Sequence, residues 1–216
     1  MVILLGAPGA GKGTHAKRLS SLLGIPHIST GDIFREEMEK NSELGCEVRR
    51  YVESGELVPD EVVNLIVKKR LSQDDCKKGF ILDGYPRTLP QARALEEILE
   101  ELSLPLKKVI NLVVSEEEII RRLSGRRICR DCGAIFHIVN MPPKKEGICD
   151  YCGGELYQRD DDMPEAIRHR LAVYHKQTEP LVRFYEEKGL LVNVNCEVPL
   201  DQSVDEIVKI LQDDSD

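Results

Sequence analysis

The chain has 216 residues, of which 41% are hydrophobic and 31% charged, and its formal net charge is −8. These values are typical of a globular protein with one α/β domain carrying insertions, or with two small domains. The acidic balance excludes broad nucleic-acid binding through a basic surface, although it permits a local basic site.

Membrane and export segments are not predicted. No apolar run approaches the roughly 18 residues that cross a bilayer, and the first residues, MVILL, lack the length and basic start of a signal peptide. We therefore expect a cytoplasmic protein with no membrane partner. In that compartment, seven cysteines indicate metal ligands or buried thiols rather than disulfides.

Short apolar runs alternate with amphipathic stretches along the chain. Unbroken runs of this kind suit strands buried on both faces, and their alternation with helices predicts a parallel sheet covered by helices on both sides. The predicted strands are Val2–Leu5, a weaker Ile25–Ile28, Phe80–Leu82, Val109–Val114 and Leu190–Val194. The predicted helices are Gly11–Leu23, Asp60–Leu71, Pro90–Leu102, Glu116–Ser124, Pro164–Lys188 and Val204–Leu211.

Two helix starts carry the pattern of a capping box. Ser115 with Glu118, and Ser203 with Glu206, have the spacing at which each side chain satisfies a free amide of the first turn. We expect helices to begin just after Ser115 and Ser203.

The last long helical stretch has its own stop signals. Pro164 fits the first helical position, Pro180 is expected to kink or break the helix, and Gly189 can end it. The acidic tail, Asp213 to Asp216, is expected to be a frayed, solvated end.

Two segments interrupt the alternation and are interpreted as insertions. Residues 30–59 predict two short helices with no strand between them, and residues 126–163 are rich in Cys, Gly and Pro, which indicates a small β-rich unit. The remaining residues, 1–29, 60–125 and 164–216, would form the core domain.

Residues 6–14, GAPGAGKGT, predict a phosphate-binding loop. They follow a buried strand and precede a helix, so that backbone amides and the helix N-terminus can hold phosphate oxygens. Lys12 would reach the terminal phosphates, and Thr14 would cap the helix or touch a phosphate. The alternative is a glycine-rich turn that only joins strand to helix.

The residue after the lysine sets this loop apart. A Ser or Thr there normally ligates Mg²⁺, and Gly13 has no hydroxyl. The Mg²⁺ of Mg-ATP must then be held by water, phosphates and a carboxylate elsewhere. Asp83 is our candidate, because it ends a predicted strand at the sheet edge where ligands gather; the alternative is an ordinary turn aspartate.

Taken together, several motifs resemble adenylate kinases. They are GAPGAGKGT, STGDIFR at 29–35, FILDGYPRT at 80–88, GRR at 125–127, and RDDD followed by IRHRL at 159–171. The resemblance runs from Met1 to about residue 196. It implies a P-loop NTPase-type five-stranded parallel sheet, a helical insert for AMP, a lid, and the reversible reaction of Mg-ATP with AMP to give two ADP. It also implies a monomer.

The resemblance also implies residue roles. Phosphate neutralisation and positioning would depend on Lys12, Arg87, Arg122, Arg126, Arg159, Arg170 and Asp83. ATP would be bound by Gly9, Ala10, Gly11, Lys12, Gly13, Thr14, Arg126, Ile135 and Phe136. AMP would be bound by Thr30, Arg35, Leu57, Val58, Gly84, Tyr85, Arg87, Gln91, Arg159 and Arg170.

The mode of AMP recognition is implied in more detail. Arg35 and Arg87 would take its α-phosphate, while a carbonyl near Val58 and the amide of Gln91 would read the adenine. Asp161 and Asp162 would help to close the lid or orient its arginines.

Three positions depart from the family pattern. His15 stands where the family often has Gln, and Cys196 and Val198 stand where a small turn residue and a base-contacting residue are expected. The ATP contact near 197–199 is therefore open.

Four cysteines form two C-x-x-C pairs, Cys129 with Cys132 and Cys149 with Cys152, each followed by a glycine. This pattern predicts a closed, structural Zn²⁺ site, although four thiolates also suit iron. A redox pair and a nucleic-acid zinc ribbon are the alternatives, and His137 is an alternative ligand. Cys46, Cys76 and Cys196 are expected to be unpaired thiols.

Two other functions compete with transfer to AMP. A nucleoside monophosphate kinase acting on UMP, CMP or GMP would share the fold, and a P-loop ATPase would use its zinc ribbon on nucleic acid. The block LDGYPR and the acidic charge disfavour the second.

Overall fold

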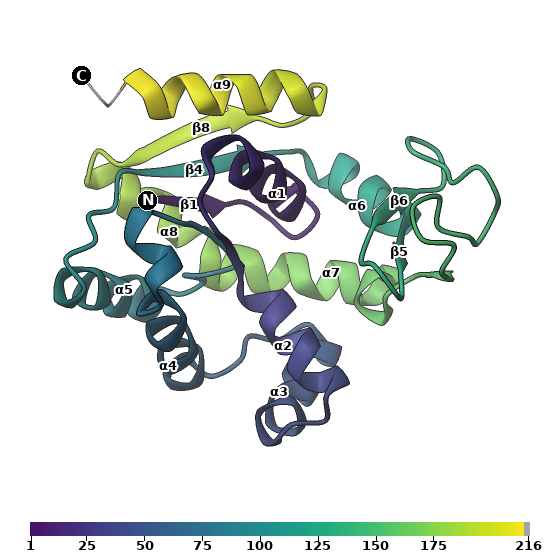
Figure 1. Ribbon diagram of the computed structural model, residues 1–216, viewed down its shortest axis with the longest axis horizontal. Helices are drawn as coiled ribbons and strands as arrows, with labels where there is room; N and C mark the ends of the chain where they lie inside the picture. Colours follow the sequence, from purple (N-terminus) through teal and green to yellow (C-terminus); the bar gives the residue numbers. More distant parts are fainter. Residues whose placement is uncertain (214–216) are drawn as a thin grey trace.

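The computed structural model describes residues 1–213 and contains a five-stranded parallel sheet with helices on both faces (Figure 1). The sheet confirms the predicted fold class, and its order is β2-β3-β1-β4-β8. Its strands are β1 (Val2–Leu5), β2 (His27–Ser29), β3 (Ile81–Asp83), β4 (Lys108–Val113) and β8 (Leu191–Asn195). The expectation for the acidic tail concerns mainly residues 214–216, which lie outside the described residues.

The strand register brings the candidate residues to one edge. Leu4 of β1 aligns with Asp83 of β3 on one side and with Ile110 of β4 on the other. Because the strands are parallel, Asp83 and the loop that follows Leu5 emerge at the same carboxyl edge.

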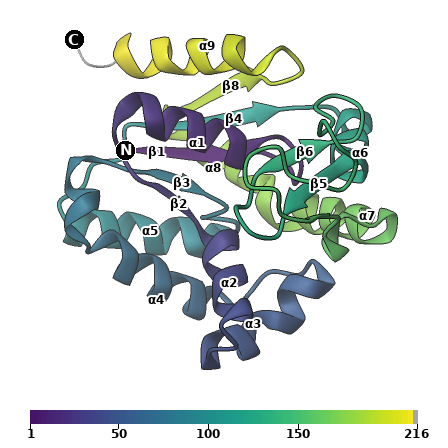
Figure 2. The same cartoon turned by 45° about the vertical axis from the view of Figure 1, so that its right-hand side comes forward.

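Alternate residues of β1 pack into two separate cores. Ile3 and Leu5 join the cluster on one face, and Val2 and Leu4 join the cluster on the other. The first cluster includes residues of α4 (Asp60–Leu71), α5 (Leu89–Glu101) and α8 (Pro180–Glu187). The second includes residues of α1 (Lys12–Leu23) and α9 (Leu200–Asp213), which lie together over the sheet (Figure 2).

The chain between α6 (Glu116–Gly125) and β8 contains the lid and a long broken helix. α7 (Pro164–Val173) begins at Pro164, as predicted, and is followed by a π-helical turn, Tyr174–Thr178. Pro180 then starts α8, so that the predicted break is confirmed. A 3-10 helix at Asp74–Lys78 was not predicted.

The two irregular segments project from the core. Residues 30–59 contain α2 (Thr30–Glu39) and α3 (Glu43–Ser54), which lie below the sheet in Figure 1. Residues 126–163 contain the antiparallel sheet β6-β5-β7, at the right of the figure, and a 3-10 turn, Asp160–Asp162. The strands are β5 (Arg126–Cys129), β6 (Ile135–His137) and β7 (Leu156–Tyr157).

The capping boxes were only partly right. Ser115 does precede α6, but its side chain makes no capping bond, and its backbone N–H donates to Glu197 Oε1 at 2.6 Å. Ser203 lies inside α9, which begins three residues earlier at Leu200. The reason is a tertiary contact, because the hydroxyl of Ser203 is engaged by His15 at 2.8 Å.

Within residues 1–213, no helix combines the length and apolar character needed to traverse a lipid bilayer.

Candidate functional site

A cavity of about 960 Å³ opens at the carboxyl edge of the sheet. The phosphate loop, α2, the β3–α5 connection, the lid and the β8–α9 connection all contribute to its wall. The predicted residues that line it are Gly9, Gly11, Lys12, Gly13, Thr14, Arg35, Leu57, Asp83, Gly84, Arg87, Arg122, Arg126, Ile135, Phe136, Arg159 and Arg170. Five others do not line it, namely Ala10, Thr30, Val58, Tyr85 and Gln91.

The phosphate loop is held by glycine geometry and by Lys12. Gly9 and Gly11 have φ of +86° and +99°, and a Cβ at Gly9 would lie 2.8 Å from the side chain of Leu123. Lys12 Nζ donates to the carbonyls of Gly6 at 2.7 Å and Ala7 at 2.9 Å. Burial lowers the pKa of Lys12 to about 8, and the nearby Asp83 opposes that shift. Thr14 does not cap α1, because Gly11 takes that position.

Asp83 lies beside the loop as predicted. It is buried, and its Oδ2 would lie 3.4 Å from a Cβ placed on Gly13. His27 Nε2 is 3.2 Å from the same oxygen. A carboxylate therefore faces the position from which the usual hydroxyl is missing.

Two arginines, Arg87 and Arg159, have no carboxylate partner within residues 1–213. Arg87 Nε donates to the carbonyl of Gly84 at 2.7 Å. The Nε of Arg159 is buried and has no hydrogen-bond partner among the described residues. Burial lowers the pKa of both guanidinium groups to about 10. Both remain charged at neutral pH, and an unsatisfied buried donor favours binding of an anion.

The arginines at the lid are paired with acidic residues of the 3-10 turn. Arg126 makes two bonds to Asp162, of 2.8 and 2.6 Å. Arg170 NH1 donates to the Asp161 carbonyl at 2.8 Å and lies 3.4 Å from Asp162 Oδ1. Arg126 and Arg170 both line the cavity, and the role of Asp161 and Asp162 in orienting them stays a prediction.

Arg122 and Arg35 have carboxylate partners on their own helices. Arg122 Nε donates to Glu118 Oε1 at 2.7 Å, and Arg35 NH2 donates to Asp32 Oδ1 at 2.5 Å. Hydrogen bonds from Arg121 and Arg122 lower the pKa of Glu118 to about 2. These arginine contacts of Glu118 and Asp32 were not predicted from the sequence, although their i, i+4 and i, i+3 spacings mark such pairs.

The remaining AMP-side residues are mostly buried behind the cavity wall. Thr30 Oγ1 donates to the Gly84 carbonyl at 2.9 Å, which ties α2 to the end of β3. Gln91 accepts from the Arg87 N–H at 2.7 Å and donates to Asp60 Oδ1 at 2.7 Å. Both ends of the Gln91 amide are therefore used within the protein, and its adenine contact stays a prediction.

The lid contributes an apolar wall and the cysteine cluster. Ile135 and Phe136 line the cavity from β6, and Phe136 packs against Cys129, Cys149 and Leu156 behind it. The ring of Tyr151 lies 5.8 Å from that of Phe136. Cys129 and Cys149 are thus part of the small core that shapes this wall.

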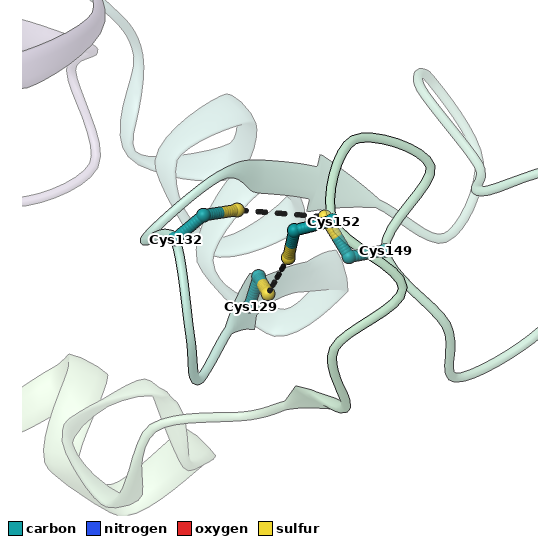
Figure 3. Close-up of side chains that lie close together, drawn as sticks. All are labelled: Cys129, Cys132, Cys149 and Cys152. Atoms are coloured by element: carbon teal, nitrogen blue, oxygen red, sulfur yellow. Dashed lines mark hydrogen bonds between the residues drawn. The ribbon is translucent and has the colours of Figure 1, made fainter.

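The four cysteine sulfurs converge on one point (Figure 3). All lie within 4.8 Å of one another, with 3.3 Å between Cys129 and Cys152 and 3.6 Å between Cys132 and Cys149. A tetrahedral ion with Zn–S bonds of about 2.3 Å separates its sulfurs by about 3.8 Å, so the donor set fits Zn²⁺. His137 lies outside this group and contacts the Arg121 carbonyl at 3.1 Å.

Each pair of cysteines belongs to a tight turn. The Gly133 N–H donates to the Cys129 carbonyl at 3.1 Å, and the Gly153 N–H to the Cys149 carbonyl at 3.0 Å. Both glycines have positive φ, of +67° and +78°, which the turns require.

Comparison with known proteins agrees with this geometry. The family model for adenylate kinase matches residues 4–190. The chain belongs to the adenylate kinase family. An adenylate kinase of Caldicellulosiruptor saccharolyticus is 57% identical over 97% of this chain and 98% of its own length. The adenylate kinase of Archaeoglobus fulgidus is 55% identical over 98% and 97%, and that of Thermosipho melanesiensis 52% identical over 98% and 99%.

Membership of the adenylate kinase family confirms the predicted resemblance. The match covers both inserts as well as the core, because it spans residues 4–190. The family assignment therefore applies to the lid as well as to the phosphate loop.

Proposed function

We propose that the chain uses this cavity to transfer the terminal phosphoryl group of Mg-ATP reversibly to AMP, giving two ADP. One observation carries the proposal: the phosphate loop and six predicted cationic side chains line a single cavity. These six are Lys12, Arg87, Arg122, Arg126, Arg159 and Arg170.

The acceptor in this reaction is already an anion, so no strong general base is needed. The barrier is dominated by positioning and by repulsion between two polyphosphates. Guanidinium groups reduce that repulsion best, since each can donate two bonds to phosphate oxygens. The high proportion of arginine in the cavity supports this reaction class.

On the donor side, loop amides and Lys12 would bind the ATP phosphates. Lys12 would exchange the carbonyls of Gly6 and Ala7 for phosphate oxygens. Mg²⁺ bound with ATP would supply positive charge that neutralises the phosphates. Asp83 is the carboxylate of this cavity best placed to help hold it, beside Gly13.

On the acceptor side, Arg35 and Arg87 would bind the α-phosphate of AMP. Arg87 gives up only the Gly84 carbonyl, whereas Arg35 must exchange Asp32 for phosphate. Leu57 lines the cavity nearby, and a carbonyl close to Val58 and the Gln91 amide would read the adenine.

Closure of the lid would complete the phosphate site and exclude water. Arg126 and Arg170 would exchange Asp162 and Asp161 for phosphate oxygens, and Arg159 would use its free Nε. Residues 30–59 and 126–163 would move as separate domains on the core formed by residues 1–29, 60–125 and 164–216.

A structural Zn²⁺ held by the cysteines at 129, 132, 149 and 152 would stabilise the lid without taking part in the reaction. Phe136 and Leu156 form a buried cluster with two of these cysteines, Cys129 and Cys149. Thiolates are maintained in a reducing cytoplasm, which is the compartment we propose. We propose that a monomer is active, as the resemblance to adenylate kinases implies.

The decisive experiment measures ADP formation from Mg-ATP with AMP, UMP, CMP, GMP or no acceptor. Rapid turnover with AMP and little without acceptor is the expected result. Preference for another monophosphate would contradict the roles of Thr30, Val58 and Gln91. Hydrolysis without transfer, stimulated by nucleic acid, would favour the ATPase alternative.

A matched pair of variants tests the site itself. Arg87→Met removes a cavity guanidinium and should lower kcat/KM by about 100-fold or more, the usual cost of a charge-stabilising donor. Arg93→Met removes an exposed arginine of α5 that is absent from the cavity wall, and should leave activity unchanged.

A further inference from the structure

His15 connects two segments that are far apart in the sequence. It lies in the first turns of α1, and its Nδ1 is 2.9 Å from the carbonyl oxygen of Gly11 in the phosphate loop. Its Nε2 is 2.8 Å from Ser203 Oγ in α9. His15 is 4% exposed and Ser203 is fully buried, so water does not compete for either bond.

The hydrogen positions follow from the partners. The Gly11 carbonyl can only accept, so Nδ1 of His15 carries a hydrogen. Burial lowers the pKa of His15, and the neutral ring is therefore favoured. Its Nε2 then accepts the hydroxyl hydrogen of Ser203, for which the Leu200 carbonyl, 3.0 Å from Ser203 Oγ, is a second acceptor.

Fixing the Gly11 carbonyl also fixes an amide of the phosphate loop. The same oxygen accepts the backbone N–H of His15 at 3.0 Å, so two donors hold it. In a trans peptide the C=O and the following N–H point in opposite directions. The N–H of Lys12 is thereby held away from His15 and is available to a phosphate.

The other end of the connection is the β8–α9 segment. Cys196, Val198, Pro199 and Leu200 line the same cavity as the phosphate loop. Cys196 Sγ lies 3.7 Å from His15 Nε2. Arg122 makes a second connection, because it donates to the Cys196 carbonyl at 2.7 Å and to the Ala10 carbonyl at 3.4 Å.

We propose that His15 is a positioning residue for ATP, which joins the phosphate loop to the β8–α9 segment through Gly11 and Ser203. It sets the direction of the Lys12 amide and the distance between the two walls that enclose ATP. This inference rests on the proposed function for its kinetic test, although ATP binding alone can also be measured.

Three variants separate positioning from packing. Ser203→Ala removes only the hydroxyl, His15→Leu removes both bonds at similar volume, and His15→Gln retains one donor and one acceptor. Ser20→Ala is the matched control, because its hydroxyl donates to the Ile25 carbonyl at 2.6 Å and it is not part of the cavity wall.

The expected result is specific to ATP. Ser203→Ala and His15→Leu should raise both the KM and the Kd for ATP by about 3- to 10-fold, the worth of a buried hydrogen bond. The KM for AMP should change less than about twofold, and His15→Gln should recover most of the affinity. Ser20→Ala should leave both constants unchanged.

Several outcomes would overturn the inference. If His15→Leu lowers the Tm but leaves the Kd for ATP unchanged, His15 contributes to packing and does not position ATP. An equal rise in the KM for ATP and the KM for AMP would show that His15 has no specific effect on ATP binding. If His15→Gln binds ATP as weakly as His15→Leu, the hydrogen bonds of residue 15 do not position ATP. If His15→Leu does not fold, Ser203→Ala decides the matter. Wild-type protein that binds ATP but transfers nothing to AMP would contradict the proposed function only, since the Kd comparison still stands.

Discussion

Asp162 and Arg126 form an ion pair with two hydrogen bonds, of 2.6 and 2.8 Å, across the base of the lid. Arg126 starts β5, where the chain enters the lid, and Asp162 belongs to the turn where the chain leaves it. Asp162 is fully buried, and its Oδ1 also lies 3.4 Å from Arg170. One carboxylate thus joins both ends of the lid to α7.

The first prediction concerns this carboxylate. Asp162→Asn keeps the shape, but it removes the counter-charge of the partly buried Arg126 and leaves Arg170 paired with Asp161. Breaking a buried pair in this way costs about 3–5 kcal/mol. We expect the free energy of unfolding to fall by about that amount, measured by urea denaturation.

Nucleotide should reduce the effect of Asp162→Asn, because phosphates replace the lost charge. A bisubstrate analogue with two adenosines and a polyphosphate should stabilise the variant more than the wild type. Asp160→Asn, on the exposed side of the same turn, is the control and should change stability by less than about 0.5 kcal/mol. Equal losses in both variants would contradict a role for the buried pair.

The second prediction concerns Lys12 and pH. Its pKa is lowered to about 8, mainly by burial, so the ammonium loses its proton as pH rises through that value. If only the charged form binds phosphate, the Kd for ATP should rise roughly tenfold between about pH 7 and about pH 9. Calorimetry in two buffers should also detect proton uptake on binding near pH 8.

Lys12→Arg is the informative control, because a guanidinium stays charged across this range. Its Kd should depend little on pH, even if its affinity is lower. The effect of pH on stability has the opposite sign. Between about pH 8 and the ordinary lysine pKa of 10.5, Lys12 carries a proton in the unfolded chain but not in the folded one. The free energy of unfolding therefore increases as pH rises through this range. A flat Kd profile in the wild type would refute the assignment.

Local patterns predicted the elements well, and tertiary contacts explain most of the misses. The buried strands and the break at Pro180 depend on signals within a few residues. Ser203 was wrongly placed at a helix start, because its hydroxyl is bound by His15, which is distant in sequence. Glu118 follows the capping spacing but bonds Arg121 and Arg122 instead, since charge-assisted bonds are stronger.

In the candidate site, too, local motifs predicted which residues take part, and tertiary contacts decide which groups they bind. The cationic residues predicted from motifs do line one cavity. Lys12, Arg87 and Arg122 follow strands that end at the same sheet edge, and Arg126, Arg159 and Arg170 are brought to it by the lid and α7. The sequence could not show which carbonyl and carboxylate groups these residues contact within the protein. Gln91, for example, carries the family's spacing, but its amide is used by Arg87 and Asp60.

The third prediction concerns the metal. We expect one Zn²⁺ for each chain, measured by elemental analysis, and a colourless protein. Chelation should unfold the lid and lower the Tm, because metal binding supplies folding free energy to such small units. Hydrogen exchange should speed up over residues 126–163 and remain slow in the parallel sheet.

Cys132→Ser should reproduce the effect of chelation, since it removes one of the four ligands. Cys46→Ser, an exposed free thiol of α3, is the matched control and should bind metal normally. Visible absorbance together with bound iron would show that the metal is iron and not zinc. A folded protein with no bound metal would contradict the proposed metal site. Loss of turnover with an intact lid and an unchanged Tm would contradict a structural role.

The fourth prediction concerns the packing of α2 against α3. Gly45 lies in the first turn of α3, where alanine would ordinarily favour the helix by about 1 kcal/mol. Here a Cβ would collide with the Glu37 carbonyl of α2, a backbone atom that cannot turn aside. Gly45→Ala should therefore separate the two helices and raise the KM for AMP at least threefold, while the KM for ATP stays within about twofold.

Cys46→Ala, at the next, exposed position, should change neither constant. An unchanged KM for AMP in Gly45→Ala would show that the close approach of α2 and α3 is not needed for AMP binding.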